Sequence, residues 1–104
     1  MDSKYTVDYQ DGIIRIELMG RLDANNAPAL QDELKQMAGK PVSKMLFFAK
    51  DLEYVSSAGL RALIFAKQKI GVDANAFLIG AQEAVLNVIK MSGLDNFLEI
   101  QDKE

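Results

Sequence analysis

The sequence predicts an α/β fold: one domain, residues 1–104, with a mostly parallel sheet of four to five strands, an opening β-hairpin and three main helices. Two observations lead to this prediction. Apolar, strand-like runs alternate with segments of helical periodicity, which is the pattern of β-α-β units with right-handed crossovers. The chain also begins with two segments of period-two alternation, which indicates that the first strand pairs antiparallel at one side of the sheet.

The opening hairpin is predicted from alternation and from its turn. Residues 5–10 and 14–18 each place an apolar side chain at every second position, which is typical of a half-buried strand. Asp11-Gly12 lies between them and is a two-residue hairpin signal.

A polar loop, residues 20–26, leads to the first predicted helix. Asn25 or Asn26 can cap this helix, and Pro28 lies in its first turn, where a residue without an N–H is tolerated. Gly39, with Pro41 two residues later, is expected to end the helix, because glycine and then proline commonly follow a helix C-terminus. The apolar positions at helical spacing are Ala27, Leu30, Leu34 and Met37.

The middle of the chain predicts a buried strand and a buried helix. Residues 45–49 are continuously apolar, which is typical of a central strand covered on both faces. Residues 51–57 are expected to form a loop, and a helix then opens at Ser56 or Ser57 and ends at Gly71. The polar face of this helix is narrow, so we expect the helix to be deeply buried or covered by a partner.

The last part of the chain predicts one more unit of the same kind. Residues 76–79 form an apolar strand, and a third helix follows it as far as Gly93. Residues 97–100 are expected to add a short edge strand. The predicted order is therefore β-β-α-β-α-β-α, with this strand at its end.

The composition argues against several classes of partner. The net charge is −3 and the isoelectric point is near 4.9, and the Lys and Arg residues are scattered, so there is no basic face for nucleic acid. No apolar run approaches the roughly 20 residues of a membrane helix. The first residues lack the apolar core of a signal peptide, and there is no cysteine for disulfides, so we expect a cytoplasmic protein.

The sequence also lacks the residues that catalysis and cofactor binding usually require. Without His or Cys, a Ser–His triad and a thiol nucleophile are impossible, and a zinc site would have to be all carboxylate. Neither the phosphate-binding Gly-x-x-x-x-Gly-Lys nor the dinucleotide-binding Gly-x-Gly-x-x-Gly occurs. We therefore expect no metal, no cofactor and no enzyme activity.

The candidate site is a pair of adjacent hydroxyls, Ser56 and Ser57, in a chain with five Ser and one Thr. At a strand-to-helix junction they fall on the first turn of a helix, where free N–H groups and the helix dipole favour an attached phosphate. Ser56 can instead be a simple N-cap, but a second serine is surplus to capping. Ala58 and Gly59 are small, which leaves space for a group to approach the backbone, and Gly59 inside a helix suggests a packing or access reason.

Asp23 is expected to lie beside these serines. In open α/β sheets, sites gather at the carboxyl ends of the strands, and the loops at 20–26 and 51–57 both leave that edge. A turn residue is the simpler interpretation of Asp23, because short loops before helices commonly carry Asp. Its proximity to Ser57 is what makes it a candidate.

Two stretches together resemble the STAS domain of bacterial anti-sigma factor antagonists. They are Gly20-Arg21-Leu22-Asp23 before the first helix and Leu52-Glu53-Tyr54-Val55-Ser56-Ser57-Ala58-Gly59-Leu60-Arg61 before the second. The resemblance covers nearly the whole chain, including the hairpin and the order of elements. Ser56 and Phe48 stand at places where many members of the family carry Asp. Phe48 is thereby expected at or near the functional edge.

The resemblance implies a partner switch. In such proteins the unphosphorylated antagonist binds an anti-sigma factor that is also a serine kinase, and this frees a sigma factor. The kinase phosphorylates the antagonist and releases it, and a PP2C-type phosphatase restores binding. By its place in the motif, Ser57 is the expected acceptor, with Ser56 second. The implied partner-binding residues are Asp23, Ser56, Ser57, Gly59 and Arg61, in a monomer.

Two alternatives use the same edge of the sheet. An enzyme or small-ligand module would need Ser57 as nucleophile, Asp23 or a Lys as base, and a deep pocket walled by Asp23, Phe48 and Ser57. A scaffold without phosphorylation would use Ser56 only as a cap and bind its partner constitutively through the exposed face of the second helix.

Overall fold

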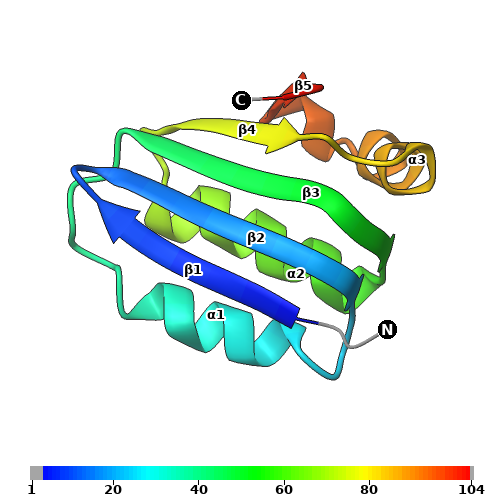
Figure 1. Cartoon of the computed structure of the whole chain (residues 1–104). Coiled ribbons are helices and arrows are strands. Elements are labelled where there is room, and N and C mark those ends of the chain that lie inside the picture. Colours follow the sequence, from blue (N-terminus) through cyan, green and yellow to red (C-terminus); the bar gives the residue numbers. More distant parts are fainter. Residues whose placement is uncertain (1–3, 104) are drawn as a thin grey trace.

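The structure is a computed structural model and describes residues 4–103. Its single sheet has the strand order β1-β2-β3-β4-β5, in which β1 and β2 are antiparallel and every other neighbouring pair is parallel (Figure 1). This arrangement confirms the predicted α/β fold with its opening hairpin. The strands are β1 (Lys4–Gln10), β2 (Ile13–Leu22), β3 (Lys44–Val55), β4 (Asn75–Ile79) and β5 (Glu99–Gln101).

Three α-helices connect the parallel strands. They are α1 (Ala27–Lys35), α2 (Ser57–Phe65) and α3 (Glu83–Ser92). Each links one strand to its next neighbour in the same direction across the sheet, so right-handed crossovers place all three on one face. Figure 1 shows α1 and α2 side by side against that face of the sheet. A short 3-10 turn, η2 (Leu94–Asn96), joins α3 to β5, which begins two residues later than predicted.

The core lies between the sheet and these helices. It is built from alternate strand residues such as Ile14, Ile16, Met45 and Phe47 together with helix residues such as Leu34, Leu63 and Ile89, all of which are buried. Leu46 and Ile79 are buried as well, but they lie outside this core. The expectation that residues 45–49 are covered on both faces therefore holds in part: helices cover only one face, but on the other face Leu46 is buried and Phe48 is half-buried. Their even-numbered side chains point away from the helices, and neighbouring side chains cover them instead.

β3 is longer than the sequence predicts. Residues 51–55, expected as part of a loop, continue the strand and pair with β2 as far as Leu22 opposite Val55. Charged side chains such as Asp51 and Glu53 are exposed, whereas Leu52 and Val55 are buried in the core. The charges that interrupt the apolar run therefore lie on the solvent side of a strand that has not ended.

The second helix opens and ends where predicted, but its last turn is π-helical. This segment, η1 (Ala66–Ile70), is followed by Gly71. The Lys67 ammonium donates to the carbonyl oxygens of Gly71 at 3.0 Å and Ala74 at 2.6 Å, which satisfies groups left unpaired at a helix end. Ala62, Leu63 and Ala66 are fully or nearly fully buried, as the first of the two alternatives for the narrow polar face expects, whereas Leu60, Ile64 and Phe65 are only half-buried.

Candidate functional site

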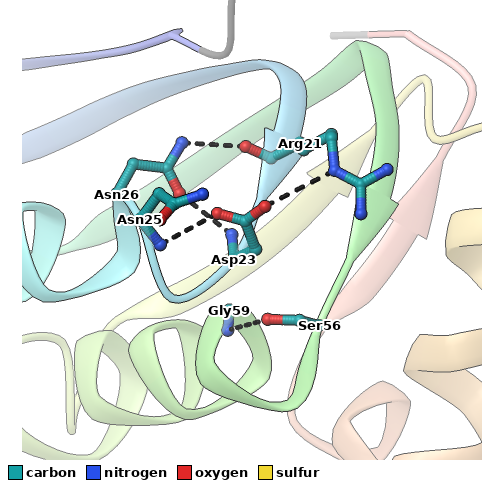
Figure 2. A network of polar contacts seen from close by, with 6 residues as sticks. All are labelled: Arg21, Asp23, Asn25, Asn26, Ser56 and Gly59. Atoms are coloured by element: carbon teal, nitrogen blue, oxygen red, sulfur yellow. Dashed lines mark hydrogen bonds and ion pairs between the residues drawn. The ribbon is translucent and has the colours of Figure 1, made fainter.

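Two neighbouring strand ends bring the candidate residues together. Leu22, the last residue of β2, is paired with Val55, the last residue of β3, and the Ser56 N–H donates to the Leu22 carbonyl oxygen at 2.9 Å. Asp23 and Ser56 are the next residues along the two chains. The loop that carries Asp23 therefore lies against the first turn of α2, as the sequence predicts (Figure 2).

Ser56 is the N-cap of α2. Its backbone is extended, and its hydroxyl oxygen accepts a hydrogen bond from the Gly59 N–H at 3.3 Å. This bond satisfies one of the donors that a helix N-terminus leaves unpaired. The side chain is half-buried, so the capping interpretation of Ser56 holds.

Ser57 has a different position. It is the first residue of α2 and is exposed. Arg61, four residues on, is exposed as well, and positions four apart face the same side of a helix. The first turn of α2 contains no acidic residue. An anion attached to Ser57 would therefore meet the positive end of the helix dipole and a guanidinium one turn away.

Gly59 is required by close packing. It is buried, and a Cβ at this position would collide with the Leu22 carbonyl oxygen and lie 3.0 Å from Val55 Cγ1. Of the two reasons that the sequence suggested for this glycine, packing is the one that the structure supports. Only glycine lets the helix start approach the end of β2 so closely.

A local hydrogen-bond network holds the Asp23 loop (Figure 2). One carboxylate oxygen of Asp23 accepts from the Asn25 N–H at 3.0 Å, and the other lies 3.4 Å from the Arg21 Nε. The Asn26 side chain accepts from the Asp23 N–H at 2.9 Å and donates to the Arg21 carbonyl oxygen at 2.8 Å. Asp23 is therefore a turn residue as well as a neighbour of the serines.

The same network corrects the predicted cap of α1. Asn26 occupies the N-cap position, but its side chain makes no capping hydrogen bond. Both polar ends of that side chain are used by the preceding turn instead. The Asp23 carbonyl oxygen accepts from the Asn26 and Ala27 N–H groups, which satisfies two donors at the start of α1.

Sequence reasoning missed the role of Arg21 and Tyr54. They are paired across β2 and β3, and the Arg21 guanidinium carbon lies 4.1 Å from the centre of the Tyr54 ring. This cation–π contact orients the guanidinium that contacts Asp23. The extension of β3 to Val55 would have revealed the pair, because it places the two residues on neighbouring strands.

Phe48 does not lie at this edge, contrary to expectation. It is in the middle of β3, paired with Glu17 of β2 and Ile79 of β4. It lines a hollow of about 560 Å³ on the sheet face that points away from the helices, together with Thr6, Asp8, Arg15, Glu17, Leu18, Met19, Lys50 and Asp51. Neither Asp23 nor Ser57 lines that hollow.

Residues 4–103 contain no group of three or more His, Cys, Asp or Glu side chains that could hold a metal ion. No helix among these residues has the length and apolar content needed to span a membrane. The candidate site consists of the exposed Ser57 and of the turn that carries Asp23, which hydrogen bonds hold in place.

Comparison with known proteins gives a consistent result. Residues 4–104 match the STAS domain family. BtrV from Bordetella bronchiseptica, a candidate anti-sigma factor antagonist, is 34% identical over 91 residues, which cover 86% of this chain and 78% of BtrV.

Solved structures share the fold at lower identity. An anti-sigma factor antagonist from Mycobacterium paratuberculosis superposes with a TM-score of 0.81 at 20% identity, covering 98% of this chain and 87% of that one. The Bacillus protein SpoIIAA superposes in its unphosphorylated form (TM-score 0.77, 16% identity, 93% and 87% covered). It also superposes in its phosphorylated form (TM-score 0.74, 15% identity, 93% and 90% covered).

Proposed function

Because the chain belongs to the STAS domain family and is similar to an anti-sigma factor antagonist over most of its length, we propose that it is a phosphorylation-controlled anti-sigma factor antagonist. Its unphosphorylated form binds an anti-sigma factor that is also a serine kinase, which frees a sigma factor. Phosphorylation releases the antagonist, and a PP2C-type phosphatase restores it. The chain acts by binding and catalyses no reaction itself.

The observation that supports this proposal is the contrast between the two serines. The Ser56 hydroxyl is half-buried and engaged in capping, whereas Ser57 is exposed on the first turn of the helix. A kinase can reach Ser57 without unwinding α2. Phosphorylation of Ser56 would instead remove the cap, so Ser57 is the acceptor. SpoIIAA, which shares the fold, has been observed in both unphosphorylated and phosphorylated forms.

The transfer itself needs only an accessible alcohol from this chain. The Ser57 hydroxyl oxygen attacks the γ-phosphorus of ATP, its proton passes to a base of the kinase, and ADP leaves. Hydrolysis by the phosphatase returns inorganic phosphate and the free alcohol. The attached group carries about −1.5 to −2 charges at pH 7, and the helix N-terminus together with Arg61 can accommodate that charge.

The partner cannot accommodate it in the same way. An interface shaped around a small hydroxyl would meet three added oxygen atoms, and the carboxylate of Asp23, which follows the strand end paired with the start of α2, adds further negative charge to the same edge. A loss of about 3 kcal/mol in binding weakens the complex more than a hundredfold. The switch therefore requires no large conformational change in this chain.

The docking surface follows from the same geometry. Ser57 and Arg61 are exposed on α2, and Asp23 and Ser56 are half-buried beside them. Gly59 is buried, so its contribution to partner binding is to hold the start of α2 against β2.

The test uses the protein with its cognate kinase and ATP, followed by intact-mass measurement. We expect one added phosphate on the wild type, none on Ser57→Ala, and continued labelling of Ser56→Ala as the matched control. Full labelling of Ser57→Ala would move the acceptor to Ser56 or another residue. Ser57→Asp should fold normally and bind the kinase poorly in a titration by calorimetry. A pull-down that is insensitive to kinase and phosphatase treatment would instead support a constitutive scaffold.

A further inference from the structure

Phe97 is an aromatic residue that the fold leaves largely in solvent. It follows the 3-10 turn η2 and is 59% exposed, whereas Leu94 at the start of that turn and Leu98 are buried. Phe97 lies at the margin of a hollow of about 80 Å³ between the second half of the α2–η1 helix and the end of α3. The residues that line the hollow with it are Ile64, Lys67, Gln68, Ser92, Gly93 and Leu94.

Ile64 connects this hollow to the candidate site. Positions three, four and seven apart share one face of an α-helix, and Ser57, Arg61 and Ile64 have this spacing within α2. Ser57 and Arg61 are exposed, and Ile64 is half-buried. One stripe of α2 therefore begins at the expected phosphate acceptor and ends at the hollow.

A partner that contacts Ser57 along this stripe also reaches the hollow. The helix rises about 1.5 Å per residue, so Ile64 lies about 10 Å from Ser57 along the axis. Each partner in a standard interface buries about 800 Å², which corresponds to a disc of about 16 Å radius. The hollow thus falls within the area that such a partner covers.

The charge of the α2–η1 helix indicates the chemistry of that partner. This helix contains Arg61, Lys67 and Lys69 and no acidic residue, although the net charge of the chain is −3. The Lys67 ammonium is held in place, because it donates to the carbonyl oxygens of Gly71 and Ala74. Opposite charges across an interface favour the correct partner and fix its register. A complementary segment therefore carries acidic residues.

We propose that the hollow receives an apolar side chain from an acidic segment of the anti-sigma factor that phosphorylates Ser57. Phe97 packs against the inserted side chain, and Lys67 and Gln68 form the polar margin. Aromatic residues at a pocket in the middle of an interface commonly carry much of the binding energy. The inference rests on the proposed function and adds a docking contact that is separate from the acceptor.

This docking contact has a kinetic consequence. It is made before phosphoryl transfer and does not involve the transferred group, so it should contribute equally to the bound state and to the transition state. Loss of such a contact raises KM and leaves kcat unchanged. Removal of the acceptor hydroxyl in Ser57→Ala, in contrast, abolishes turnover.

The experiment titrates the purified cognate anti-sigma factor with this chain in a calorimeter, without ATP. We expect Phe97→Ala to bind at least about tenfold more weakly than the wild type. Met91→Ala is the matched control, because Met91 is 88% exposed and is not among the residues that line the hollow. It should bind within about twofold of the wild type. With ATP, Phe97→Ala should show a raised KM and the wild-type kcat.

A pair of substitutions at Gln68, which is exposed at the margin, tests the sign of the partner's charge. Gln68→Glu should weaken binding and Gln68→Lys should strengthen it, each by a few-fold, and both effects should shrink in high salt. Circular dichroism of each variant shows whether it is folded. The opposite order of the two affinities would reject an acidic partner segment.

The outcomes separate this inference from the proposed function. A wild type that binds the anti-sigma factor and is phosphorylated on Ser57, with Phe97→Ala equal to it in affinity and KM, would overturn only the docking contact. A wild type that neither binds nor is phosphorylated would overturn both. Self-association of the wild type in sedimentation velocity that Phe97→Ala abolishes, with unchanged affinity for the anti-sigma factor, would assign the hollow to a second copy instead.

Discussion

The two strand-to-helix junctions at the candidate site differ in how they use their polar side chains. At the β2–α1 junction, Asp23 and Asn26 bind groups of their own turn. At the β3–α2 junction, Ser56 caps the helix and Ser57 remains exposed. The polar side chains of the first junction hold its turn in place, whereas the second junction leaves one serine exposed. Two adjacent strand ends of one sheet thus differ in how many of their polar side chains serve the local structure.

Replacing Gly59 with alanine should disrupt the contact that unites the junctions. The new Cβ would collide with the Leu22 carbonyl oxygen, which is backbone and cannot rotate away. We expect the free energy of unfolding to fall by about 1–3 kcal/mol despite the better helix propensity of alanine. Urea unfolding followed by circular dichroism measures this. Unchanged stability would mean that α2 is not held against β2 as described.

Replacing Asn26 with alanine should weaken the hydrogen-bond network that holds the Asp23 loop. The variant loses the acceptor for the Asp23 N–H and the donor to the Arg21 carbonyl oxygen. We expect a loss of about 1–2 kcal/mol. Asn25→Ala is the matched control, because Asn25 enters the network through its backbone N–H and should be close to neutral. Equal losses from both variants in denaturant unfolding would contradict this assignment.

Replacing Ser56 with alanine should cost less, because one hydrogen bond at the helix start is lost. A cap of this kind contributes about 1 kcal/mol. Thermal unfolding of Ser56→Ala and Ser57→Ala compares the two serines directly. The second should change stability by less than about 0.5 kcal/mol, as for an ordinary surface position. The reverse order would assign the cap to Ser57.

A charge on Ser57 should also have only a small effect on stability. Ser57→Asp places a carboxylate on the first turn of α2, where the dipole stabilises it by about 0.3–1 kcal/mol at low ionic strength. The gain should shrink in roughly 0.5 M salt, which screens exposed charges. Thermal unfolding at the two salt concentrations checks this. A marked destabilisation would show that the first turn does not tolerate negative charge.

Much of the fold could be predicted from local patterns. The Asp11-Gly12 turn, the alternation in β1 and β2, and the glycine stop after α3 are all in their predicted places. The end of β3 could not be predicted, because Lys50, Asp51 and Glu53 resemble a loop until their pairing with β2 is known. The π-helical turn could not be predicted either, because the Lys67 ammonium donates to carbonyl oxygens four and seven residues further on, and these contacts leave no periodic signal in the sequence.

The candidate site, too, was predictable in its topology and not in its side-chain contacts. Topology alone predicted that Asp23 and the serines are neighbours, since both loops leave one edge of a parallel sheet. The side-chain partners could not be predicted in the same way. Asn25 or Asn26 was expected to cap α1, but two backbone groups of the preceding turn compete for the Asn26 amide. The Arg21–Tyr54 contact required the true length of β3.

The hydrogen bond from the Ser56 N–H to Leu22 and the contact that excludes a side chain at Gly59 fasten the start of α2 at two points. A helix secured in this way has little freedom to retreat into the protein or to swing aside. Any group added to Ser57 must then project outward. A group added to Ser57 would therefore change the shape and charge of the surface and leave the backbone conformation unchanged.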